Sequence, residues 1–181
     1  HEIRTPMNAI LGFTEVLKRG WGKSEREARK HLDTIHSSGK HLIELINDIL
    51  DLSKIEAGRM EVERIDCEPH LVIREVVKVL QARAREKGVT LAFEAGTPLP
   101  AKIQSDPGRL RQIVTNLAGN ALKFTERGGV TVSLAAGDGG VRIDVRDTGI
   151  GIAASQHELI FEAFRQADGS STRTHGGLGL G

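Results

Sequence analysis

The chain has 181 residues, with 25 lysine and arginine residues against 24 aspartate and glutamate residues, so its formal net charge is +1. This balance gives no general attraction for polyanions and argues against nucleic acid or an anionic lipid surface as a partner. Cys67 is the single cysteine, no Cys/His cluster has the spacing of a zinc site, and no apolar run reaches the ~20 residues of a membrane span. We therefore expect a cytoplasmic segment without direct membrane contact, with any anchor of the parent protein lying outside this sequence.

Two apolar series near the start of the chain predict a pair of helices. Both series step by alternating fours and threes, which is the spacing of a coiled-coil or helical-bundle seam. The series are Ile3, Met7, Ile10, Thr14 and Leu17, then Ala28, Leu32, Ile35, Gly39, Leu42, Ile46 and Ile49. Between them, Ser24 followed by Glu27 has the pattern of a helix start, so we expect a helical hairpin whose second arm runs from about Glu25 to Ala57.

The predicted hairpin is too thin to bury its apolar residues alone. Leu11, Val16, Ile43 and Leu50 widen the apolar stripe beyond a single seam. Two copies forming a four-helix bundle would cover this surface, so we expect a homodimer. His31, His36 and His41 step by five and spiral around the second helix, so we interpret them as flank or surface residues and not as a metal site.

After Gly58 the pattern changes to interleaved strands and helices, which predicts a second domain over residues 59–181 following a hairpin domain over residues 1–58. The expected elements are a strand over 59–65, a helix over 69–87 ended by Gly88, a strand over 89–95, a helix opened by Asp106 and Pro107 that runs through Phe124, and a β-hairpin over 128–147. At least one strand pair is antiparallel. The fold class we expect is therefore an α+β sandwich and not a doubly wound parallel sheet.

One helix face of this second domain carries unusual polar residues. In "NLAGNALKFT", Asn116, Asn120 and Lys123 recur at spacings of four and three and share one side of the helix. Such a face can offer a carbonyl oxygen to a hard metal ion and an ammonium group to a phosphate. By spacing alone, a solvated helix face is the favoured alternative.

Two glycine-rich stretches follow. In "DTGIGI", Asp147 ends a strand and Gly149 and Gly151 permit a tight, closely approaching backbone, although an ordinary strand-exit turn has the same pattern. In "HGGLGLG", backbone amides can wrap phosphates, although a linker can also be rich in glycine.

Taken in order, five stretches resemble the conserved boxes of the sensor histidine kinases of two-component signalling. "HEIRTPMNAI" resembles the phosphoacceptor box, "NLAGNALKFT" the asparagine box, "DTGIGI" the first glycine box, "FEAFRQAD" the phenylalanine box and "THGGLGLG" the second glycine box. The resemblance implies a dimerisation and phosphotransfer hairpin, a four-helix bundle in the dimer, followed by an ATP-binding domain of the Bergerat type.

The resemblance implies roles for three residues of the hairpin. His1 would take the terminal phosphate of ATP on a ring nitrogen, and a response-regulator aspartate would then receive it. Glu2 would orient or deprotonate the imidazole. Thr5, one helical turn after His1, would position water when a phosphorylated response regulator is dephosphorylated.

The resemblance also implies a nucleotide site, with ATP and Mg²⁺ as cofactors. Asn120 would bind magnesium with Asn116 beside it, Lys123 would reach phosphate, and Asp147 would accept a hydrogen bond from the adenine amine. The lid would pack on Phe161 and Phe164, for which plain core positions are equally open. The remaining residues that the resemblance assigns to the nucleotide are Gly149, Gly151, Gly177, Gly179 and Gly181.

Two departures from the family pattern affect the expected activity. Leu178 stands where the family usually has Thr or Ser, and the sequence stops at Gly181, before the helix and strands that close the family's domain. We therefore expect a segment truncated at both ends that is a poor kinase by itself. The alternative is a non-catalytic or phosphatase-biased dimeric module, while a chaperone or topoisomerase ATPase is disfavoured because those proteins lack a phosphoacceptor hairpin.

Overall fold

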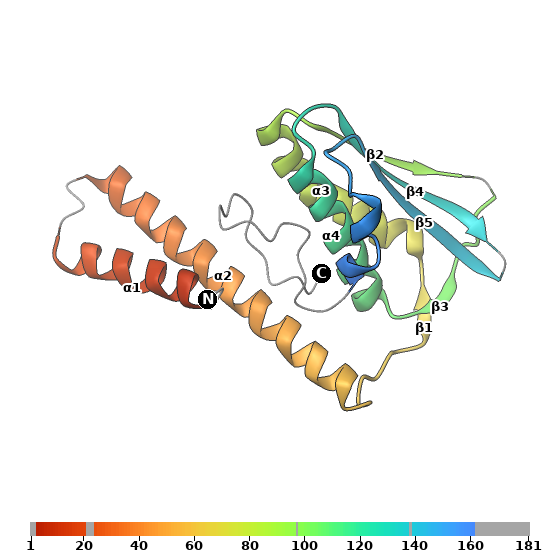
Figure 1. Cartoon of the computed structure of the whole chain (residues 1–181), viewed down its shortest axis with the longest axis horizontal. Coiled ribbons are helices and arrows are strands. Elements are labelled where there is room, and N and C mark those ends of the chain that lie inside the picture. The colour runs from red at the N-terminus through yellow and green to blue at the C-terminus, as the bar shows by residue number, and fades with distance from the viewer. Residues whose placement is uncertain (1–2, 21–23, 97, 138, 162–181) are drawn as a thin grey trace. The chain divides into compact units, whose positions relative to one another are not determined.

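The computed structural model describes residues 3–20, 24–96, 98–137 and 139–161 of the chain. These residues fall into two units: the first comprises the residues up to Met60 together with residues 158–161, and the second runs from Glu61 to His157. The first unit is helical and the second combines helices with strands (Figure 1). Each unit is described by itself.

The first unit is the predicted helical hairpin. Helix α1 spans Arg4–Lys18 and helix α2 spans Glu25–Glu56, and the two pack along each other. The side chain of Ser24 caps α2, because its oxygen accepts a hydrogen bond from the backbone N–H of Glu27 at 3.2 Å. The chain leaves α2 through Gly58, whose φ of 64° is the left-handed conformation expected after a helix.

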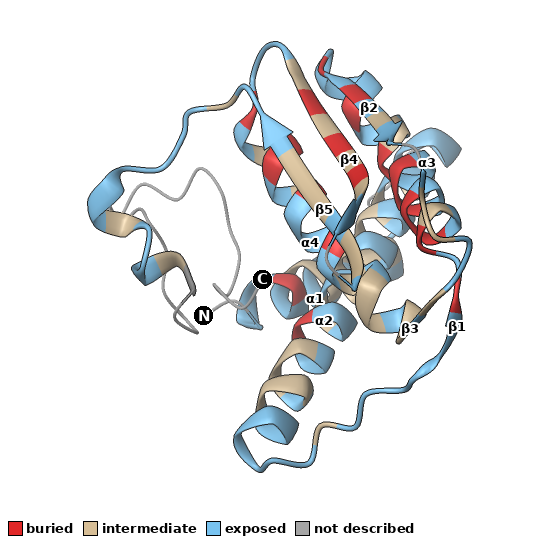
Figure 2. Ribbon diagram, turned by 90° about the vertical axis from the view of Figure 1, so that its right-hand side faces the viewer, coloured by how far each residue is buried: buried red, intermediate tan, exposed pale blue. Residues whose placement is uncertain are grey.

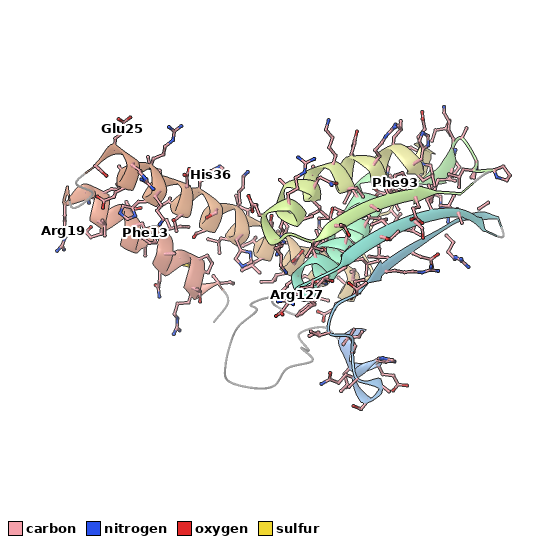
Figure 3. All side chains as sticks on the ribbon, turned by 90° about the horizontal axis from the view of Figure 1, so that it is seen from above. Phe13, Arg19, Glu25, His36, Phe93 and Arg127 are labelled. Atoms are coloured by element: carbon pink, nitrogen blue, oxygen red, sulfur yellow. The ribbon has the colours of Figure 1, made fainter. Side chains whose placement is uncertain are left out.

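The two arms of the hairpin meet through an aromatic contact. Phe13, labelled on α1 in Figure 3, stacks on the ring of His31 with the centroids 5.0 Å apart and the planes at 25°. His31 is half-buried, which agrees with the flank position expected for it, and the aromatic partner is an addition to that prediction. His31 is next to Leu32 of the apolar series, so its ring lies at the edge of the apolar stripe. At this half-buried position, Phe13 provides an aromatic partner.

The segment after the hairpin is less regular than predicted. The strand expected over 59–65 was wrong, because only Ile65–Cys67 forms a strand, β1, and residues 61–66 are exposed. Alternation alone cannot make a strand without a partner backbone. β1 pairs in antiparallel fashion with β3, Ile103–Ser105, over three residues, and the N–H of Glu63 donates instead to the carboxylate of Asp106 at 3.3 Å.

The larger elements of the second unit agree with the sequence. Helix α3 spans Pro69–Lys87 and ends at Gly88 with φ 67°, and helix α4 spans Pro107–Phe124 with Asp106 as its N-cap. The strands are β2 (Thr90–Ala95), β4 (Gly129–Gly137) and β5 (Gly140–Asp147), and a short 3₁₀ turn follows at Ala154–Gln156. A further 3₁₀ turn, Leu159–Phe161, belongs to the first unit.

The three longer strands form a mixed sheet in the order β2-β4-β5. β2 runs parallel to β4 and pairs Thr90 with Gly129 at one end and Ala95 with Leu134 at the other. β4 and β5 form the predicted antiparallel hairpin, and Gly137 pairs with Gly140 at the turn. The fold class is the expected α+β arrangement, with parallel and antiparallel pairs in one sheet.

Helices α3 and α4 cover one face of this sheet (Figures 1 and 2). Along β4 the buried residues alternate with less buried ones, as the red bands on this strand in Figure 2 show. The buried residues are Val130, Val132 and Leu134, which belong to the same core cluster as buried residues of α3 and α4. Phe93 of β2, labelled in Figure 3, packs against the same core. The core therefore lies between one sheet face and two helices, and it fixes the side of α4 that remains exposed.

Within the described residues, no helix combines the length and apolar character needed to span a bilayer.

Candidate functional site

Helix α4 presents the predicted polar face to solvent. Its start is fixed by Asp106, whose carboxylate accepts from the N–H of Arg109 at 3.0 Å, and by Pro107 in the first turn. Its inner side is buried through Val114, Ala118, Ala121 and Leu122. Because this side faces the sheet, Asn116 and Asn120 are left exposed and Lys123 half-buried on the outer side.

Electrostatics reinforce the start of α4. The hydrogen bond from the N–H of Arg109, helped by those from Glu63 and Gly108, holds the pKa of Asp106 below its ordinary value. The carboxylate is therefore ionised at neutral pH, where it offsets the positive end of the helix dipole. Because Glu63 precedes β1, Asp106 also connects the segment that enters this unit to α4.

The Asp147 loop is built by hydrogen bonds at the end of β5. The carboxylate of Asp147 accepts from the N–H of Gly149 at 2.8 Å, which turns the chain immediately after the strand. Asp147 is exposed, and the described residues contain no partner for its second carboxylate oxygen. That oxygen is available to accept a hydrogen bond from an amine.

The two glycines of this loop, Gly149 and Gly151, are required for different physical reasons. A Cβ on Gly149 would lie 2.5 Å from the carbonyl oxygen of Phe124, so no side chain fits there. Gly151 has open space around it but a φ of 70°, which side chains disfavour. The prediction of a close-approaching backbone is confirmed at Gly149, where the approaching group is the last turn of α4.

The end of α4 and the Asp147 loop are directly bonded. The N–H of Ile150 donates to the carbonyl oxygen of Phe124 at 3.3 Å. An open hollow of about 250 Å³ lies at this junction, lined by Phe124, Glu126, Arg127, Thr148, Gly149 and Ile150. The structure thus joins the helix that carries Asn116, Asn120 and Lys123 to the loop that carries Asp147, Gly149 and Gly151.

Sequence reasoning missed Thr148. Its hydroxyl donates to the carbonyl of Arg127 at 3.0 Å and accepts from the N–H of Gly129 at 3.0 Å, while its own N–H donates to the carbonyl of Gly129 at 3.1 Å. The loop is therefore tied to the start of β4 as well as to α4. A Cβ on Gly128 would meet the Thr148 hydroxyl. In the sequence, Gly128 and Gly129 at the start of β4 indicate that another group approaches closely, but they do not show that this group is Thr148.

Sequence reasoning also missed Lys87. Its Nζ donates to the backbone carbonyls of Leu122 at 2.6 Å and Lys123 at 2.9 Å, 35 and 36 positions further along the chain. A lysine in the last turn of a helix is ordinary, and no local pattern shows that it reaches a second helix.

Several predicted site residues lie outside the described part of the chain. They are His1, Glu2, Phe164, Gly177, Gly179 and Gly181. Phe161 is described only as the last residue of a 3₁₀ turn. Thr5 lies exposed in the first turn of α1.

The donor set of α4 fits a magnesium nucleotide. The described residues contain no cluster of three or more His, Cys, Asp or Glu side chains able to hold a metal ion. A magnesium ion here would need few protein ligands, because it retains water and binds phosphate oxygens, and the exposed Asn120 amide can supply one oxygen. Lys123, whose ammonium lies 5.0 Å from the centre of the Phe124 ring, is on the same side of the helix.

Two protein-family models match the chain. Residues 1–58 match the His Kinase A (phospho-acceptor) domain, and residues 105–181 match the histidine kinase-, DNA gyrase B- and HSP90-like ATPase. The first match covers the helical hairpin, and the second begins at the end of β3 and includes α4 and the Asp147 loop.

Curated relatives align along the entire chain. The signal transduction histidine-protein kinase BarA of Escherichia coli K12 is 42% identical over 187 residues, covering 100% of this chain and 20% of BarA. The autoinducer 2 sensor kinase/phosphatase LuxQ of Vibrio vulnificus is also 42% identical over 187 residues, covering 100% of this chain and 22% of LuxQ. The chain thus spans about a fifth of the length of these relatives.

Two solved structures of histidine kinases are similar to this chain over most of its length. Full-length ShkA in complex with AMPPNP is 38% identical with a TM-score of 0.73, covering 99% of this chain and 37% of ShkA. The histidine kinase ThkA in complex with the response regulator TrrA is 25% identical with a TM-score of 0.61, covering 92% of this chain and 48% of ThkA. With a phospho-acceptor hairpin and an ATPase domain in this order, the chain belongs to the sensor histidine kinases and contains their core.

Proposed function

We propose that this chain is the part of its parent protein that transfers the terminal phosphate of ATP to His1 and then to a response-regulator aspartate. The observation that carries the proposal is the hydrogen bond between Ile150 and Phe124, which joins the Asp147 loop to the helix bearing Asn120 and Lys123. An adenine-binding carboxylate and a phosphate-binding helix face therefore belong to one bonded unit. The phospho-acceptor match over residues 1–58 supplies the other half of the reaction.

In the proposed nucleotide site, each end of ATP has its own partners. Asp147 accepts a hydrogen bond from the adenine amine, and Gly149 and Gly151 let the loop backbone approach the base. Asn120, with Asn116 beside it, provides an amide oxygen for magnesium, and Lys123 contacts phosphate. When bound, magnesium would offset the charge on the phosphate oxygens. The lid glycines Gly177, Gly179 and Gly181 would close over the phosphates through backbone amides, with Phe161 packed beneath the lid.

In the proposed reaction, a neutral His1 imidazole is the nucleophile. Its ring nitrogen forms a bond to the terminal phosphorus while the bond from that phosphorus to the bridging oxygen of ADP breaks, and ADP leaves. Glu2 orients the imidazole. The phosphoryl group then passes from the ring nitrogen to a carboxylate oxygen of the receiver aspartate. A homodimer and a receiver domain are therefore the proposed partners, and a cytoplasmic location, where ATP is present, is the proposed setting.

Labelling with radioactive ATP tests this function. The parent protein incubated with γ-labelled ATP and magnesium should gain an acid-labile, alkali-stable label, which His1→Gln and chelation of magnesium should both abolish. Asp147→Asn should reduce labelling because it weakens the contact with adenine. Asp144→Asn, on the same strand and in an ion pair with Arg142 at 3.0 Å, is the matched control and should label normally. Label that persists in His1→Gln would contradict the proposal.

A phosphatase-biased module is the second candidate. Thr5 is exposed on α1 one turn after His1, where its hydroxyl can position a water molecule, and LuxQ is itself named as a sensor kinase/phosphatase. Receiver domains phosphorylated with acetyl phosphate should lose phosphate in the presence of the chain and not in the presence of Thr5→Ala. This activity without any labelling of His1 would favour the second candidate over the first.

A further inference from the structure

One side chain outside the proposed nucleotide site closes the end of α4. The last carbonyls of a helix have no partner within it, and those of Leu122 and Lys123 both receive hydrogen bonds from the Nζ of Lys87, at 2.6 Å and 2.9 Å. Lys87 is the last residue of α3. Its ammonium group therefore spans from one helix to the next and sits at the negative end of the α4 dipole.

The same turn of α4 carries the Asp147 loop. The carbonyl that follows those of Leu122 and Lys123 belongs to Phe124, and it accepts from the N–H of Ile150 at 3.3 Å. Gly149 lies so close to this carbonyl that a Cβ would approach it to 2.5 Å. A movement of the last turn of α4 would therefore displace the loop, because no space remains between them to absorb it.

We propose that Lys87 is a positioning residue for nucleotide binding. By holding the carbonyls of Leu122 and Lys123, it fixes the last turn of α4, and through Phe124 it fixes the distance between Asp147 and the Asn120–Lys123 face. The inference depends on the proposed nucleotide site. Lys87 makes no contact with ATP in this scheme and acts only through the turn that joins the two halves of the site.

The effect of Lys87 on binding should exceed its effect on folding. α4 is held on the sheet by the buried residues Val114, Ala118, Ala121 and Leu122, and Thr125 closes the preceding carbonyl, that of Ala121, through both its N–H at 3.0 Å and its hydroxyl at 2.7 Å. Loss of the lysine would therefore loosen the final turn without removing the helix. Local opening of this kind changes the site geometry while the core stays folded.

Nucleotide affinity tests the inference directly. In calorimetric titration of the full chain with the ATP analogue AMPPNP, Lys87→Met should weaken binding about tenfold, which corresponds to about 1.4 kcal/mol. Lys87→Arg should recover most of the affinity, because a guanidinium can donate to both carbonyls. Lys78→Met is the matched control, since Lys78 is exposed on the same helix and has no hydrogen bond or ion pair among the described residues.

Hydrogen exchange separates positioning from general destabilisation. In the nucleotide-free chain, Lys87→Met should speed exchange at the N–H groups of Thr125 and Ile150 and leave those of β4 unchanged. Unchanged AMPPNP affinity, or faster exchange spread over β4, would overturn the inference. If Lys87→Met does not fold, Lys87→Gln, which retains a donor, should give a smaller change of the same kind. Absence of AMPPNP binding by the wild-type chain would overturn the nucleotide site itself and the role of Lys87 with it.

Discussion

The hairpin and the ATPase unit differ in how far each buries its own apolar side chains. In the hairpin, Leu45 is 3% exposed, but Leu11, Leu32 and Ile43 are 64%, 56% and 61% exposed. In the ATPase unit, α3, α4 and the sheet enclose a continuous core that includes Ile73 and Leu122, both 0% exposed. The nucleotide site therefore rests on a scaffold that needs no second chain, whereas the phospho-acceptor hairpin needs an apolar partner, which in our proposal is a second copy.

The largest expected effect tests this dependence in the hairpin. Ile46→Glu places a charge in the apolar stripe of α2, where Ile46 is 43% exposed. If a second copy covers the stripe, the dimer dissociation constant should rise about a hundredfold, because a desolvated unpaired charge costs at least ~2.7 kcal/mol. Sedimentation measured over a range of concentrations gives the constant. AMPPNP affinity should stay unchanged, because the ATPase core does not depend on the stripe.

Ser37→Glu is the control for this variant. Ser37 is exposed on α2 nine positions before Ile46, about two and a half turns of helix, so the two side chains point in opposite directions. The same new carboxylate should there leave the dimer intact. Equal weakening by both variants would mean that net charge, and not the apolar stripe, governs association.

The next effect tests the ATPase core with two identical substitutions on one helix. Val76 is 3% exposed and Val79 is 77% exposed, and both lie on α3. Val76→Ala should lower the free energy of unfolding by about 2 kcal/mol, because it removes buried methyl groups and leaves a cavity. Val79→Ala should change it by less than about 0.5 kcal/mol. Urea unfolding followed by circular dichroism measures both, and similar values would mean that the outer side of α3 is covered in solution.

The same contrast explains which features could be predicted from sequence. Helix ends are local, so Ser24, Gly88 and Asp106 identified them correctly, and so did the spacing that put Asn116, Asn120 and Lys123 on one side of α4. Features that depend on partners distant in sequence were missed. The pairing of Cys67 with Ile103, the stacking of His31 on Phe13, and the reach of Lys87 to Leu122 leave no periodic signal.

A glycine-to-alanine substitution in each unit tests the same difference between the hairpin and the ATPase unit, with smaller expected effects. Gly149→Ala should destabilise the ATPase unit by about 1 to 2 kcal/mol, because the new Cβ would meet the carbonyl of Phe124 at 2.5 Å. Gly12→Ala on α1 should instead stabilise the hairpin by up to about 1 kcal/mol, since nothing lies within 4 Å and alanine favours a helix. Thermal unfolding of the two variants should give shifts of opposite sign. A loss of stability in Gly12→Ala would reveal a close neighbour on α1 in the dimer.

The smallest effect is a response to acid that differs in sign between the units. In the ATPase unit, hydrogen bonds, first that from the N–H of Arg109, lower the pKa of Asp106 below 3.8. The Asp106 carboxylate therefore takes up a proton more readily in the unfolded chain than in the folded one. The ATPase unit consequently loses stability as the pH falls below about 4. Burial, then the charges of Asp51 and Glu44, raise the pKa of Asp48 above 3.8, partly offset by His41. The folded hairpin therefore binds the Asp48 proton more readily and gains stability as the pH falls from neutral towards 4.

Urea unfolding between pH 7 and pH 3 should resolve the two responses. These limits bracket the ordinary aspartate pKa of about 3.9. Fluorescence of Trp21, the single tryptophan, reports on the hairpin because it lies between α1 and α2 in sequence, and circular dichroism reports on both units. Asp48→Asn should raise the stability of the hairpin at neutral pH and make that stability less dependent on pH. Asp106→Asn should still cap α4, and it should remove part of the acid sensitivity of the ATPase unit. The contrary result would be a hairpin that loses stability steadily from pH 7 to pH 4, with Asp48→Asn behaving like the wild type. It would show that the Asp48 carboxylate is fully solvated in the dimer.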